Sequence, residues 1–259
     1  MALVNYEGSG SSSSEDDPPN LIFNTLKRSA ALPTAVTLLG PKKAKPVEED
    51  ADEVVDDPAL HGGRIRSFKH ERGNWATYVY VAALACAEQL EEFQEEAIAC
   101  LAPDVQMQAN EPLHLSLSRT VVLQYHQIDE FSRSLQVALN SSTGFASTLQ
   151  GLKIYTNGER TRTFLAVQLD GAFTEKVLSI LQPIDKVMHD YRLPKFYAPP
   201  SFHVSLLWCV GDHEELLNKK LKELRVLLED QDTLQLAVNE IHCKCGKKDF
   251  TYKLKQNVV

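Results

Sequence analysis

Two five-residue stretches decide the fold expected of this chain: Leu113-His114-Leu115-Ser116-Leu117 and Phe202-His203-Val204-Ser205-Leu206. They match in chemical character at every position, because an apolar residue alternates with a histidine or a serine in both. Alternation with a period of two is typical of a β-strand whose two faces differ in polarity. The sequence therefore predicts two equivalent strands, each with an apolar face toward the core and a His/Ser face toward a polar cleft.

The His/Ser faces suit proton transfer at a phosphate. One H-x-S match has little weight by itself, because a chain with 8 histidines contains such matches by chance. Two matches on equivalent strands are more specific, since a histidine pair can remove one proton and donate another near neutral pH. The serines can donate hydrogen bonds to phosphate oxygens. His114 and His203 are thus the candidate catalytic residues, and Ser116 and Ser205 the candidate phosphate ligands.

In RNA, such a pair can cleave the chain next to a 2′-hydroxyl. One imidazole takes the hydroxyl proton, the freed oxygen attacks phosphorus, and the second imidazole protonates the departing 5′-oxygen. The product carries a 2′,3′-cyclic phosphate, and this chemistry needs no metal. The motif pair therefore points to a metal-independent RNA phosphodiesterase.

The elements around the two motifs form alternating strands and helices. Strands are expected over residues 74–81, 113–120, 149–156, 161–169, 202–210, 233–243 and 249–254, and helices over 84–101, 128–139, 173–191 and 214–228. The pair Asn157-Gly158 favours a tight turn between two of the strands. A helix follows each motif-bearing strand, which indicates two related halves of an α+β domain with helices packed on sheets.

The N-terminal part of the chain differs in composition from the rest. Residues 1–68 are expected to form a disordered, Ser-rich and acidic tail, and residues 69–259 the folded domain. A short basic cluster at 41–46 suits a nuclear import receptor, although a few solvated lysines explain it equally well. Residues 1–60 hold 5 Lys and Arg against 11 Asp and Glu, a balance of −6 out of the net charge of −8, so the rest of the chain is near neutral. RNA binding is therefore expected at a local site and not over a broad basic surface.

Several other classes of protein are disfavoured. No apolar run reaches the roughly 20 residues that a membrane span needs, and the N-terminus lacks a signal-peptide pattern. The five cysteines predict reduced thiols. His242-Cys243-Lys244-Cys245 resembles a metal knuckle, but a structural zinc site needs four ligands and a second cysteine pair is missing. Cysteines near the end of a strand are the better interpretation, and no metal or cofactor is expected.

Further stretches make the chain resemble a known family. They are Arg72-Gly73-Asn74-Trp75-Ala76-Thr77, Lys153-Ile154-Tyr155-Thr156-Asn157, Thr161-Arg162-Thr163-Phe164 and the run from Pro200 to Gly211. Together with the two motifs they are similar, over about residues 70–254, to the two-histidine (2H) phosphoesterases and most closely to the U6 small nuclear RNA phosphodiesterases. The resemblance implies a two-lobed α+β fold with pseudo-twofold symmetry, antiparallel sheets that line a central groove, and helices on the outside.

The resemblance also implies a function. Members of this family trim the 3′ oligouridine tail of U6 RNA in the nucleus as 3′–5′ exoribonucleases and leave a cyclic phosphate end, with adenosine ends as a second candidate substrate. The implied partner is a single-stranded RNA 3′ end, and the implied protein is monomeric, nuclear, free of cofactors and not bound to a membrane. The resemblance favours His114 as base and His203 as acid, a choice that the near-symmetric motifs leave open.

The family pattern adds candidate substrate contacts. Tyr197 is expected to stack a terminal base, in preference to being an ordinary loop aromatic, and Ser201 to hydrogen-bond the nucleotide or phosphate. The other candidate substrate-binding residues are Leu115, Phe202, Val204 and Gly158. Gly158 and Ala198-Pro199 depart from the family pattern, which puts base contacts at those positions in doubt.

The sequence leaves open the role of four charged residues and the choice among competing functions. Lys153, Arg160, Arg162 and Lys195 are candidates for steering the phosphate backbone, although a solvated surface explains each of them as well. The same four His/Ser residues would also serve a phosphodiesterase that only opens 2′,3′-cyclic ends. A nucleotide-binding module without turnover is a third reading, against which the two intact motifs count.

Overall fold

The computed structural model describes residues 71–229 and 233–256. The disorder predicted for the tail at 1–68 and the basic cluster at 41–46 lie outside the described residues, so both stay predictions. No helix in the described ranges combines the length and apolar character of a membrane span. All five cysteines are free thiols, as the sequence predicts.

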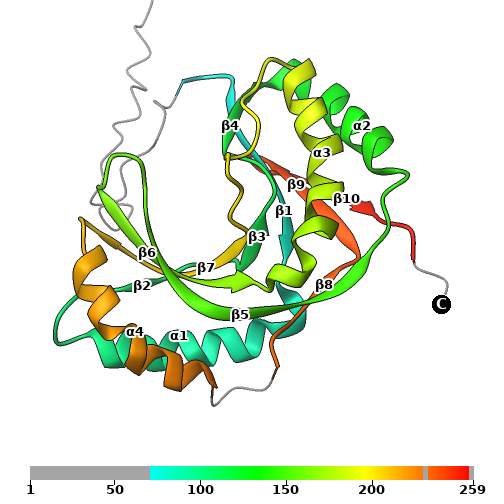
Figure 1. The fold of residues 1–259 in the computed structure, drawn as a ribbon. Helices are drawn as coiled ribbons and strands as arrows, with labels where there is room; N and C mark the ends of the chain where they lie inside the picture. Colours follow the sequence, from blue (N-terminus) through cyan, green and yellow to red (C-terminus); the bar gives the residue numbers. More distant parts are fainter. Residues whose placement is uncertain (1–70, 230–232, 257–259) are drawn as a thin grey trace, which may run out of the picture. The chain divides into compact units, whose positions relative to one another are not determined.

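The folded unit is built on one curled antiparallel sheet (Figure 1). Its strands are β1 (Asn74–Ala82), β2 (Gln108–Ala109), β3 (His114–Ser116), β4 (Val121–Gln124), β5 (Phe145–Thr156), β6 (Arg162–Leu169), β7 (His203–Val210), β8 (Gln235–Val238), β9 (Glu240–Cys245) and β10 (Lys248–Lys253). The order across the sheet is β10-β9-β1-β3-β7-β6-β5-β8, with β4 also paired to β1 and β2 to β7. Strands from the two halves of the chain therefore meet at the middle of the sheet, where β3 pairs with β7.

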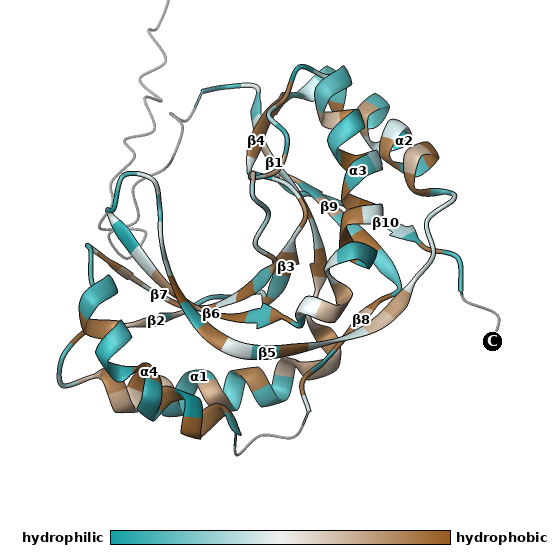
Figure 2. Cartoon of the chain, viewed as in Figure 1, coloured by the Kyte–Doolittle hydropathy of each residue, from teal (hydrophilic) through white to brown (hydrophobic). Residues whose placement is uncertain are grey.

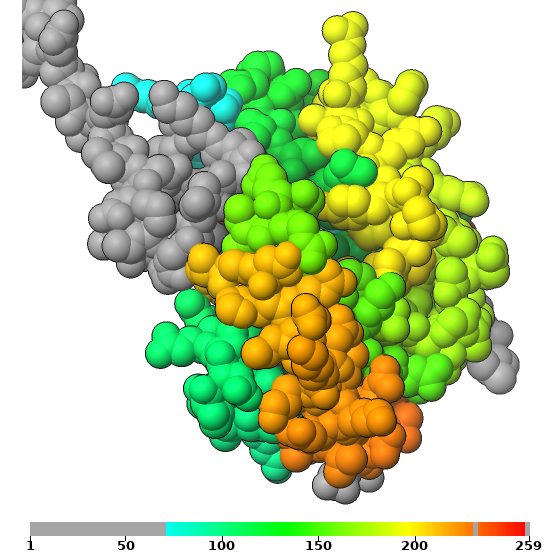
Figure 3. Space-filling model, turned by 60° about the vertical axis from the view of Figure 1, so that its left-hand side comes forward, coloured from blue at the N-terminus to red at the C-terminus, as the bar shows by residue number. Residues whose placement is uncertain are grey.

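Two helix pairs cover the outside of the sheet (Figure 1). The helices are α1 (Ala87–Leu101), α2 (Ile128–Leu139), α3 (Thr174–Asp190) and α4 (Glu214–Glu229). Helices α1 and α4 pack on each other beneath β7 and β5, and Figure 3 shows them side by side at the surface. Helices α2 and α3 form the second pair, beside β10. Polar and apolar residues alternate along these helices in Figure 2, as expected of helices that bury one face. The predicted α+β, two-lobed fold is confirmed.

Two predicted strands differ from the observed ones. The strand expected over 113–120 ends at Ser116, and the chain turns to form β4. Ser118 lies in the turn, where its buried hydroxyl accepts from the Val79 amide at 2.8 Å and donates to the Arg119 carbonyl at 2.9 Å. The strand expected over 233–243 is divided into β8 and β9 at Asn239. Local hydrogen bonding interrupts the first strand, and a change of strand partner interrupts the second. The alternation of apolar residues alone reveals neither interruption.

Candidate active site

The two motifs face each other across the middle of the sheet. Leu115 of β3 is the register partner of Val204 of β7. Because the strands are antiparallel, this pair puts His114 opposite Ser205 and Ser116 opposite His203. The side chains alternate as predicted: Leu115 and Val204 are fully buried in the core, and the two histidines are half-buried on the other face. One small square on the concave face thus holds both histidines on one diagonal and both serines on the other.

The diagonal of this square suits a phosphate. Diagonal neighbours on antiparallel strands lie about 7–8 Å apart between Cα atoms, within reach of two imidazoles that lean toward each other. The charge of His114 lowers the pKa of His203, as expected of two rings on the same face of paired strands. Within the described residues, no hydrogen bond occupies the hydroxyl of Ser116 or Ser205, so both hydroxyls are available to an incoming anion.

Both histidines are held by the same backbone contact. The Nδ1 atom of His114 lies 2.7 Å from the Pro112 carbonyl, and that of His203 lies 2.8 Å from the Ser201 carbonyl. A carbonyl can only accept, so each Nδ1 carries the proton and each Nε2 is left with the lone pair in the neutral ring. The exchangeable position is therefore Nε2 in both rings, which can act as a base when neutral and as an acid when protonated.

The second histidine is also clamped by an aromatic ring. Tyr155 of β5 stacks on His203 with centroids 4.1 Å apart and planes 18° apart. The Tyr155 hydroxyl bonds the Ser201 hydroxyl at 2.7 Å and accepts from the Gln168 amide at 3.4 Å. The Ser201 carbonyl thus holds the His203 ring, and the Ser201 hydroxyl holds Tyr155. This pairing gives the Ser201 hydroxyl a structural partner, while its predicted contact with the nucleotide stays a prediction.

The first histidine has a different aromatic setting. Tyr80, the cross-strand neighbour of Ser116, meets the His114 ring edge-on at 5.2 Å, and Tyr78 lies 5.6 Å from the same ring. On its other side Tyr80 stacks on His242 at 5.2 Å. The two imidazoles are therefore not equivalent, because His203 is stacked face to face, whereas His114 is bordered by one edge-on ring and one tilted ring.

Burial controls the charge of both imidazoles. Desolvation lowers the pKa of His114, and the carbonyl of Pro112 partly offsets it. Desolvation is also the main cause of the lowered pKa of His203, where the charges of Lys153 and His114 act in the same direction. Both shifts favour neutral rings in the empty site. A bound phosphate would act in the opposite direction, because its negative charge favours the imidazolium form.

Tyr197 lies at the edge of this site. Its neighbour Phe196 stacks on Phe202, one residue before His203, with centroids 5.7 Å apart. The Tyr197 ring is 57% exposed, which leaves room for a base to stack on it. Arg119, from the turn after β3, lies over the ring with its Cζ atom 4.2 Å from the centroid. The predicted stacking role is thus open to Tyr197, and it stays a prediction.

Four other predicted substrate contacts have no side chain that faces the square. The side chains of Leu115, Val204 and Phe202 are in the core, so only their backbone groups can face a substrate. Gly158 lies in the loop between β5 and β6, beside the end of β7 at Val210, because Arg162 pairs with Val210. His203 is at the other end of β7, roughly 20 Å away at the rise of a strand. A contact from Gly158 to the nucleotide at the histidines is not supported by this placement.

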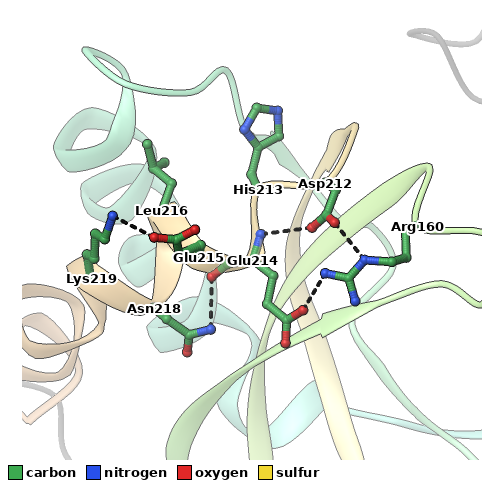
Figure 4. A pocket seen from close by; sticks show the side chains of 8 residues that line it. All are labelled: Arg160, Asp212, His213, Glu214, Glu215, Leu216, Asn218 and Lys219. Atoms are coloured by element: carbon green, nitrogen blue, oxygen red, sulfur yellow. Dashed lines mark hydrogen bonds and ion pairs between the residues drawn. The ribbon is translucent and has the colours of Figure 1, made fainter.

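Ion pairs hold the Gly158 loop against the start of α4 instead. Arg160 donates to Asp212 at 2.6 Å and to Glu214 at 2.7 Å, in the surface pocket drawn in Figure 4. Both carboxylates pair with the Arg160 guanidinium, which gives Arg160 a structural role, while its steering role stays a prediction. Lys153, another predicted steering cation, lies beside the site, with its Nζ 5.1 Å from the Tyr155 ring centroid.

The aromatic rings around the histidines were not predicted from the sequence. Tyr155 and Lys153 alternate on β5, and Tyr78 and Tyr80 alternate on β1, so period-two spacing marks each pair as sharing a face. That spacing does not reveal which face is concave. Only the order of the strands, with β1 beside β3, brings Tyr80 next to Ser116.

The cysteines of the possible metal knuckle face the core. Cys243 and Cys245 are buried on β9, with their sulfur atoms 3.7 Å apart. In the described ranges no three His, Cys, Asp or Glu side chains are grouped as metal ligands. The strand assignment is confirmed, and the expected independence from cofactors stays a prediction.

Comparison with known proteins adds to this geometry. A family model described as "HVSL: Uncharacterised conserved protein" matches residues 32–253. A relative from Drosophila melanogaster named "U6 snRNA phosphodiesterase 1" is 72% identical over 262 residues, which cover 98% of this chain and 100% of the relative. The chain belongs to this family. The resemblance expected from the motifs is therefore confirmed, and the letters HVSL spell His203-Val204-Ser205-Leu206 in this chain.

A second relative and one solved structure are also similar to this chain. A human relative of the same name is 40% identical over 210 residues, covering 77% of each chain. The solved structure of Kluyveromyces marxianus Usb1 aligns with 71% of this chain and 99% of its own, at 18% identity and a TM-score of 0.49.

Proposed function

We propose that this protein is a 3′–5′ RNA exonuclease that trims the 3′ end of U6 snRNA and leaves a 2′,3′-cyclic phosphate. The observation that carries the proposal is the square of His114, Ser116, His203 and Ser205, in which two exchangeable imidazole nitrogens bracket a space with two free hydroxyls. The name shared by the relatives supports U6 snRNA as the substrate.

The reaction follows from the position of the two rings. Neutral His114 accepts the proton of the 2′-hydroxyl on the nucleotide before the scissile phosphate, and the oxygen attacks phosphorus. Protonated His203 gives its Nε2 proton to the 5′-oxygen of the departing terminal nucleoside. Ser116 and Ser205 donate hydrogen bonds to the non-bridging oxygens and stabilise the charge that builds there. Each event leaves the RNA one nucleotide shorter and returns the two rings with exchanged protons.

Action at an end of the RNA is supported by Tyr197. Its exposed ring lies next to the phosphate square and can stack the last base, which is how single-stranded ends are commonly held. A stacked terminal uracil brings the preceding phosphate between the histidines. The basic cluster at 41–46 supports a nuclear location.

The experiment is incubation of an RNA ending in oligouridine with the full chain in EDTA, followed by mass spectrometry of the RNA. We expect products shortened from the 3′ end, each one water lighter than the same RNA with a linear phosphate. A second arm supplies an oligonucleotide that already has a cyclic end. Opening of that end without any trimming would favour a cyclic phosphodiesterase, and binding without turnover would favour a nucleotide-binding module.

A further inference from the structure

Arg119 is a cation at the edge of the groove that the reaction above does not use. It lies three residues after Ser116, in the turn between β3 and β4, and its guanidinium covers one face of Tyr197 at 4.2 Å. Arg119 belongs to the first half of the sheet and Tyr197 to the segment before β7, so this contact spans the two halves beside the phosphate square.

The hydrogen bonding of Arg119 is incomplete. Its Nε is buried and has no acceptor in the described part of the chain. No carboxylate of these residues lies within 4.0 Å of its guanidinium, whereas Arg160 has two. A buried donor without a partner is costly and calls for an explanation, such as a catalytic role or an ion that it binds. The guanidinium packs on the Tyr197 ring and has no anionic partner among the described residues.

We propose that Arg119 binds a phosphate oxygen of the RNA end whose last base stacks on Tyr197. This inference rests on the proposed function and adds a substrate-binding residue to it. Tyr197 holds the guanidinium on one face and offers the opposite face to the base, so the arginine and the base do not lie in one plane. The acceptors within reach of the arginine are therefore those of the sugar–phosphate chain, and the planar fork of five donors matches phosphate oxygens well.

The chemistry of the contact predicts how removal of the Arg119 guanidinium should change KM. A charge-assisted hydrogen bond to phosphate contributes about ten- to a hundredfold in binding. Its loss should raise KM by that factor for any terminal base, because a phosphate contact carries no sequence information. It should also lower the slope of log KM against log salt concentration by about one, because one fewer phosphate charge is neutralised.

The test compares Arg119→Met and Arg119→Lys with the wild-type chain on RNAs that end in uridine or in adenosine, at several salt concentrations. Arg133→Met is the matched control, because it removes the same charge from the exposed surface of α2. We expect Arg119→Met to raise KM about equally for both RNAs and to flatten the salt dependence, Arg119→Lys to recover part of both effects, and the control to do neither.

Three outcomes overturn the inference. A rise in KM for uridine ends alone would indicate a contact with the base. An unchanged salt slope would mean that Arg119 only supports the Tyr197 ring, and an unchanged KM would mean that it touches no substrate. Wild-type chain that trims neither RNA contradicts the proposed function itself, so the two failures are distinguishable. Unfolding midpoints of the variants exclude loss of the fold as the cause.

Discussion

Replacing either His114 or His203 by alanine is expected to lower the rate of RNA trimming by about 10²- to 10⁴-fold, the usual contribution of one positioned acid or base. Both rings lie on the concave face, half-buried and held through Nδ1, so removing them takes away chemistry and not core packing. The measurement is the single-turnover rate on an RNA with a 3′ oligouridine end.

The control for these variants is His189→Ala. His189 lies in the last turn of α3 with a side chain that is 74% exposed, so its removal should leave the rate unchanged. A variant of His114 or His203 that keeps more than about a tenth of the wild-type rate would show that its imidazole does not transfer a proton in the slow step.

A single 2′-deoxy sugar should block trimming almost completely when it lies just before the scissile phosphate. The proposed nucleophile is the hydroxyl of that sugar, and without it the histidines have no oxygen to activate. The measurement is the product pattern of oligouridines that differ at one sugar. The expected result is a chain that stops shortening at the modified position.

The matched substrate carries the deoxy sugar at the terminal nucleotide instead. Its hydroxyl takes no part in the first cleavage, so this nucleotide should be removed at the normal rate. Equal trimming of both substrates would exclude attack by the 2′-oxygen and favour a water nucleophile.

The sequence predicts the chemistry of the site better than its surroundings. His114, Ser116, His203 and Ser205 could be assigned because the alternation of polar and apolar residues marks a strand face, and the fold brings the two faces together. Element types were also predictable, because helical and strand periodicities are strong in this chain.

The supporting residues could not be predicted, because they depend on strand order. Tyr155 reaches His203 from β5, and Arg119 meets Tyr197 from the far half of the sheet. Neither contact has a fixed spacing in sequence. The ion pairs of Arg160 with Asp212 and Glu214 likewise depend on the fold and have no signal in the sequence around Arg160.

The claim that two imidazoles flank one phosphate is tested most directly by NMR of the ring nitrogens. The ligand is a uridine dinucleotide that lacks the reactive 2′-hydroxyl and so cannot be cleaved. In the free protein both rings should titrate below their ordinary pKa of 6.5, because burial disfavours their charge. On binding, both pKa values should rise together with one dissociation constant, because the same anion lies between them. A ligand that shifts one ring and leaves the other unchanged would contradict the account.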